Sequence, residues 1–197
     1  MRSISINHLR AIILATSMTC MTTAIADDVS DAIDEASKAY ESGDVNTAVE
    51  NLNFAVQLLQ QMKGEKLSEL LPEALDGWTA GEAESAAVGA AMFGGGLTAK
   101  RSYQKDKSKV KIEIVTDSPM IQSMVALFTN PLFGASGGKM TKINGHKAML
   151  EYNKKRQKGE YKLMINNRYM VTVNGRKVEA DELKAYVEAI PFDEFEK

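Results

Sequence analysis

The first part of the chain has apolar residues at the spacing of amphipathic helices. Ala32, Ala36, Ala39 and Tyr40 recur at helical intervals, and the pattern resumes after a break at Ser42-Gly43-Asp44. The second set of apolar positions is Val45, Ala48, Val49, Leu52, Ala55, Val56 and Leu59. This spacing predicts a helical hairpin over Val29–Met62. We expect Gly64 to end its second helix and a short third helix to cover Lys66–Leu71, so that the helical part spans 27–72.

After residue 73 the apolar period changes to two, which predicts β-strands with one solvated face. The segments with this alternation are Leu97–Tyr103, Val110–Ile114, Ala148–Tyr152, Tyr161–Ile165 and Tyr169–Val173, and we expect a further short strand over Lys139–Asn144, closed by Gly145. Asn, Asp and Gly between them are typical of hairpin turns and favour antiparallel order. Helical spacing returns in Pro119–Phe128 and in Ala180–Ile190. The sequence therefore predicts an α+β fold: an N-terminal helical hairpin, then an antiparallel sheet domain over 73–197 with helices packed on one face.

Small residues surround the predicted hairpin turn. Ala36 precedes it, and Ala48 and Ala55 lie in the second helix with Leu52 between them. These positions resemble a single tetratricopeptide repeat over about 34 residues. Because one such repeat cannot bury its own apolar face, the resemblance implies that the rest of this chain or another protein covers that face.

From about Leu75 onward, the order of strands and helices is similar to that of PsbP-like domains. These domains are named for an extrinsic subunit of the photosynthetic oxygen-evolving complex and also occur in small exported bacterial proteins. The resemblance rests on element order and not on a shared motif. It implies an accessory or binding role more often than catalysis.

Residues 1–26 have the features of a secretory signal peptide. These are two arginines, an uncharged apolar run and a small-x-small cleavage pattern: Arg2, Arg10, Ala11–Thr19 and Ala24-Ile25-Ala26. We therefore expect export to the periplasm and a mature chain that begins at Asp27. Ser17-Met18-Thr19 lacks the residues that precede a lipidated cysteine, so we expect cleavage after Ala26 and not lipidation at Cys20.

Charge is divided unevenly along the predicted mature chain. Between Asp27 and Gly95 there are 14 acidic and 3 basic residues, whereas Gly96–Lys197 has 12 acidic and 19 basic residues. The acidic helical part and the basic sheet part could neutralise each other within one molecule. Alternatively, the basic sheet face contacts an anionic membrane, a cell-wall surface or an acidic partner. We expect no nucleic-acid partner for an exported protein.

Two apolar, glycine-rich stretches are the least ordinary part of the chain: Ser85–Leu97 and Leu127–Gly138. Such loops could simply cover one end of the sheet as part of the core. The functional hypothesis is that they form a contact surface for a partner or an apolar ligand. The candidate contact residues are Phe93, Phe128, Leu132 and Phe133.

The sequence holds no catalytic or metal-binding constellation. His146 is the only histidine outside the predicted signal, and Gly134–Lys139 has three residues where a phosphate-binding P-loop needs four. We therefore predict a non-catalytic protein with no cofactor and no metal. The leading hypothesis is an accessory or interaction protein whose contact surfaces are the acidic hairpin and the glycine-rich loops. The alternative is a binder or carrier of a small apolar or amphipathic ligand such as a lipid.

Overall fold

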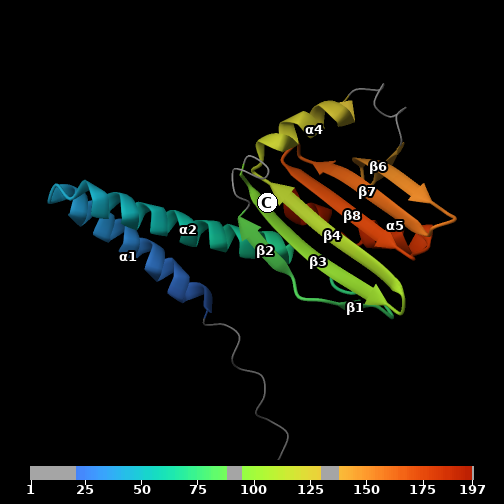
Figure 1. Ribbon diagram of the computed structural model, residues 1–197, viewed down its shortest axis with the longest axis horizontal. Helices are drawn as coiled ribbons and strands as arrows, with labels where there is room; N and C mark the ends of the chain where they lie inside the picture. The colour runs from blue at the N-terminus through green and yellow to red at the C-terminus, as the bar shows by residue number, and fades with distance from the viewer. Residues whose placement is uncertain (1–20, 88–94, 130–137, 197) are drawn as a thin grey trace, which may run out of the picture. The chain divides into compact units, whose positions relative to one another are not determined.

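The computed structural model describes residues 21–87, 95–129 and 138–196 (Figure 1). The chain divides into two compact units, Met1–Leu59 and Gln60–Lys197. The elements in chain order are α1 (Met21–Glu41), α2 (Val45–Glu69), β1 (Thr79–Ala80), β2 (Glu84–Ala87), β3 (Leu97–Lys105), β4 (Ser108–Thr116), α4 (Pro119–Thr129), β5 (Lys139–Ile143), β6 (His146–Asn153), β7 (Lys158–Ile165), β8 (Tyr169–Arg176), α5 (Ala180–Glu188) and a final 3-10 helix, η2 (Phe192–Glu196).

The described strands form one antiparallel sheet in the second unit. Its order is β1-β3-β4-β8-β7-β6-β5, with β2 also paired to β3. The six predicted strands are present, and so are the helices predicted at Pro119 and Ala180. The α+β class is therefore confirmed. β1, β2 and η2 were not predicted.

One face of the sheet carries the main core. Its side chains pack with α5 and with the end of α2, and Leu163, Val171 and Ile112 are fully buried there, whereas Leu150 is partly buried. α5 approaches the sheet closely over a pair of facing glycines, Gly159 and Gly175. A Cβ at either position would lie 3.0 Å or less from a side-chain carbon of Leu183. The missing side chains thus provide the space into which α5 packs.

α4 packs against the opposite face of the sheet. Phe128 and Ile121 of α4 form a second buried cluster with Met164. Met164 alternates with the core residues Leu163 and Ile165 along β7, so its side chain lies on the other face. The helices on the main face are therefore supplemented by one helix on the second face.

The segment between α2 and the sheet is held by two residues of β3. The hydroxyl of Tyr103 donates to the carbonyl of Pro72 at 2.6 Å, and the Arg101 guanidinium donates to the same carbonyl at 3.3 Å and to Glu73 at 2.9 Å. Arg101 lowers the pKa of the Glu73 carboxyl through this hydrogen bond. Trp78 is buried and lies edge-on to Tyr186.

The first unit contains α1 and the beginning of α2, which run in opposite directions (Figure 1). Their buried residues are small: Val29, Ala32, Ala36, Ala48 and Ala55. The turn between them uses Gly43 at a φ of 83°, and Asp44 caps α2 by accepting from the backbone N–H of Thr47 at 3.1 Å. The predicted hairpin and its turn are therefore present.

The prediction that Gly64 ends the second helix is wrong, because α2 continues to Glu69 and includes the expected third helix. Gly64 instead allows a close approach to β2. A Cβ at this position would lie 2.9 Å from the hydroxyl oxygen of Ser85.

Replacement of Gly175 by Ala should destabilise the sheet unit by about 1–3 kcal/mol, as overpacking of a core does. The new methyl would lie 2.3 Å from Val178 and 2.8 Å from Leu183. Chemical denaturation measures the change. Gly81→Ala is the control, since its Cβ would meet an ordinary contact at 3.4 Å. Equal stability of the two variants would contradict this account of the helix–sheet contact.

Replacement of Tyr103 by Phe should cost about 1 kcal/mol, because it removes a buried hydrogen bond to Pro72. Tyr186→Phe should be neutral or slightly stabilising. Its buried hydroxyl lies near the backbone of Leu75 but makes no hydrogen bond of normal geometry with the described residues. Thermal unfolding of both variants measures the two changes in stability. A larger loss of stability for Tyr186→Phe than for Tyr103→Phe would contradict the view that only the Tyr103 hydroxyl makes a stabilising hydrogen bond.

Candidate functional site

The residues predicted as a contact surface divide into two groups. Phe93, Leu132 and Phe133 lie outside the described residues. Phe128 is 6 % exposed and packs with Ile121 and Met164. This places Phe128 in the core and not on a contact surface.

A different apolar surface is exposed on α2. Five aliphatic side chains of this helix are each 44 to 58 % exposed: Val45, Val49, Leu52, Val56 and Leu59. Their spacing alternates between four and three residues, as in the seam of a coiled coil. The residues that α2 buries in the first unit, Ala48 and Ala55, form a separate neighbouring stripe.

α1 extends this surface. Ile33 is 46 % and Tyr40 72 % exposed, and each follows a buried or half-buried alanine by one position. Val49 and Val56 of α2 stand in the same relation to Ala48 and Ala55. In an antiparallel pair, such positions fall on the same side of both helices. We call this set of seven residues the hairpin face; its members are Ile33, Tyr40, Val45, Val49, Leu52, Val56 and Leu59.

The hairpin face lies in a strongly acidic segment. Between Asp27 and Leu59 there are eight acidic residues and one basic residue, Lys38. The acidic charge and the apolar positions are visible in the sequence, but the sequence alone does not separate exposed from buried positions. Two spacings in α2 could have separated exposed from buried positions. The larger aliphatic side chains recur every four and three residues, whereas the buried alanines, Ala48 and Ala55, are seven residues apart.

A second candidate site lies on the sheet face opposite α5, the face against which α4 also packs. Three cations stand directly opposite one another on adjacent strands: Lys109 of β4 pairs with Arg176 of β8, which pairs with Lys158 of β7. We call these three residues the basic row. Within the described part of the chain, none of them makes an ion pair or a side-chain hydrogen bond, although adjacent like charges repel.

Other lysines on the same face do have carboxylate partners. Lys100 contacts Glu84 at 2.9 Å, Lys111 contacts Glu113 at 2.6 Å, and Lys162 contacts Glu160 at 2.5 Å. The hydrogen bond from Glu84 raises the pKa of Lys100. Unlike these three lysines, the residues of the basic row have no carboxylate partner among the described residues.

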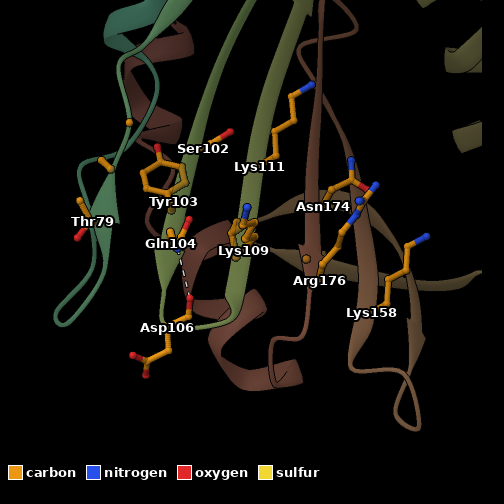
Figure 2. Close-up of a pocket in the computed structure, with 14 residues that line it drawn as sticks. Thr79, Ser102, Tyr103, Gln104, Asp106, Lys109, Lys111, Lys158, Asn174 and Arg176 are labelled. Atoms are coloured by element: carbon orange, nitrogen blue, oxygen red, sulfur yellow. Dashed lines mark hydrogen bonds between the residues drawn. The ribbon is translucent and has the colours of Figure 1, made fainter.

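The basic row lines a pocket of about 880 Å³ that is also bordered by the β1 segment, Thr79–Gly81 (Figure 2). Lys111, Asn174 and Ser102 lie in the next row of the same face. The side chains of Ser102 and Asn174 make no hydrogen bond with the described residues, so their polar atoms face the pocket unpaired. Asp106 is the carboxylate at the pocket's edge. The pocket thus combines the three unpaired cations of the basic row with Lys111, which is paired with Glu113, and with two polar side chains that make no hydrogen bond among the described residues.

No group of three metal-ligating side chains occurs in the part of the chain that the structure describes. His146 begins β6 and stacks on Phe192 with ring centroids 4.9 Å apart. Within residues 21–87, 95–129 and 138–196, no helix has the length and apolarity needed to span a bilayer.

Comparison with known proteins gives no relative: no family model, no curated protein and no solved structure matches this chain. The two candidate sites are therefore interpreted from their own chemistry.

Replacement of Lys158 by Gln should raise the melting temperature by about 1–2 °C, because it removes repulsion from Arg176. The gain should shrink in high salt, which screens exposed charges. Lys162→Gln is the matched control on the same strand and face, and it should give no gain because Lys162 is paired with Glu160. A lower melting temperature for Lys158→Gln would show that the basic row is not a repulsive cluster.

Proposed function

We propose that this chain is an exported, non-catalytic interaction protein whose hairpin face docks onto a partner protein. The observation that supports this proposal is the exposure of seven large apolar side chains on one side of a two-helix unit. A helical face of this kind is normally covered by another element, and contiguous exposed apolar surface is typical of a protein contact. Export rests on the signal-peptide pattern in residues 1–26.

The apolar area can supply useful binding energy. Burial of a fully exposed Val or Leu side chain is worth about 1.5–3 kcal/mol, so burial of the remaining half is worth about 1 kcal/mol for each residue. Over the hairpin face the gross gain is several kcal/mol, from which the cost of association must be subtracted. Contact with Leu52 and Val56, near the middle of the α2 stripe, should dominate.

Charge indicates the kind of partner. The first unit has eight acidic residues and one basic residue between Asp27 and Leu59, so two copies of the hairpin face would repel each other. A partner with an apolar ridge and a basic rim would gain from both the apolar contact and the charge. A four-three apolar stripe matches an amphipathic helix with lysine or arginine beside its apolar side.

The proposal is tested with a synthetic amphipathic helical peptide that has leucines at four-three spacing and flanking lysines. The full chain should bind this peptide at low salt, and an analogue with glutamates in place of the lysines should bind much more weakly. Leu52→Glu should abolish binding, because it places a charge in the centre of the stripe. Binding is measured by fluorescence anisotropy, and circular dichroism checks that each variant is folded.

Gln57→Glu is the control for this experiment. It adds the same charge to an exposed position of α2 outside the hairpin face. Equal loss of binding in Gln57→Glu and Leu52→Glu, or failure of the chain to bind either peptide, would refute the proposal. Native mass spectrometry of protein purified from its host provides a second measurement. A bound small apolar molecule in place of a protein would favour the carrier hypothesis.

A further inference from the structure

The basic row is a costly arrangement for the fold. Cross-strand neighbours in an antiparallel sheet have Cβ atoms about 4.5–5.5 Å apart, so Lys109, Arg176 and Lys158 repel one another at close range. A carboxylate at one of these positions would remove the repulsion, as Glu113 and Glu160 do for other lysines of this face. The row is therefore better suited to a bound anion than to stability of the sheet.

Carboxylates limit where an anion can bind. Glu160 of β7 pairs with Asn174 of β8, and Glu151 of β6 pairs with Glu160. Negative charge therefore borders one side of the pocket. Asp106 borders it at the β3–β4 turn. The site that favours an anion is therefore the basic row itself, which these carboxylates border but do not enter.

The order of the cations indicates the kind of anion. Arg176 occupies the middle of the basic row, and a guanidinium binds phosphate oxygens through two parallel N–H donors. The flanking lysines contribute one compact charge on each side. A single phosphate carries a charge of about −1.5 to −2 at pH 7, less than the three positive charges of the basic row, whereas two linked phosphates carry enough charge to neutralise all three.

We propose that the pocket over the basic row binds the diphosphate group of a small molecule, independently of the hairpin face. Arg176 holds the bridging region of the diphosphate, and Lys109 and Lys158 each neutralise one end. Ser102 and Asn174 supply neutral polar contacts from the next row. The pocket volume of about 880 Å³ leaves room for an organic group attached to the diphosphate.

Inorganic pyrophosphate is the probe that tests this proposal. Isothermal titration calorimetry on the full chain should show saturable one-to-one binding, and pyrophosphate should raise the melting temperature because it binds the folded state. Orthophosphate should bind at least about tenfold more weakly, since it carries about half the charge of pyrophosphate. Arg176→Gln and Lys158→Gln should each weaken pyrophosphate binding by about tenfold or more. Lys158→Gln separates binding from folding, because the same change is expected to stabilise the protein.

Lys100→Gln is the control, since Lys100 lies on the same sheet face but is paired with Glu84 and is not part of the pocket. It should leave pyrophosphate affinity unchanged. Absence of saturable binding at millimolar pyrophosphate, or equal losses in Lys100→Gln and Arg176→Gln, would overturn the proposal. Equal affinity for orthophosphate and pyrophosphate would also overturn it.

The source of the diphosphate is distinguished by vesicles. Phosphatidylcholine vesicles with and without an isoprenyl diphosphate are sedimented with the protein. Co-sedimentation that requires the isoprenyl diphosphate and Arg176 indicates a lipid headgroup. Pyrophosphate binding without co-sedimentation indicates a soluble ligand. Both results support the diphosphate site, whereas vesicle binding that survives Arg176→Gln and occurs without pyrophosphate binding contradicts it.

Discussion

The close contact between α5 and the sheet over Gly159 and Gly175 is the constraint on which the second unit depends. Leu183 enters the space left by the two glycines and is fully buried there. The pairing of Gly159 with Gly175 also sets the pairing of the next residues, Lys158 with Arg176, whose side chains point to the other face. The packing that closes the core thus fixes the geometry of the basic row.

The sequence was sufficient to predict the strands whose side chains alternate between core and solvent. β2 was missed because all four of its residues are exposed, so no alternation marks it. The course of α2 was missed for a different reason: Gly64 was interpreted as a helix end, whereas it serves the approach of Ser85, which a local pattern does not reveal. The placement of α4 on the second face likewise depends on the register of Met164, which only strand pairing determines.

For the candidate sites too, the sequence pattern shows which residues are apolar or charged, whereas packing and strand pairing decide which of them are exposed or adjacent. The apolar positions of α2 were visible in the sequence, but their exposure depends on which of them α1 covers. The basic row joins residues almost seventy positions apart, Lys109 and Arg176, through the pairing of β4 with β8. A sequence pattern gave a basic sheet face, but it could not show that three cations share one row without a carboxylate. Glycine-rich composition was a poorer guide, because Phe128 beside it lies in the core.

The continuity of α2 has a consequence for how the protein can be divided. The helix runs from Val45 to Glu69, and the boundary between the two compact units falls inside it, after Leu59. A cut at this boundary would leave four carbonyl groups on one fragment and four N–H groups on the other without their helical partners. Neither unit can therefore be excised at a loop. A fragment meant to represent the hairpin or the sheet alone would need a designed helix cap at its new end.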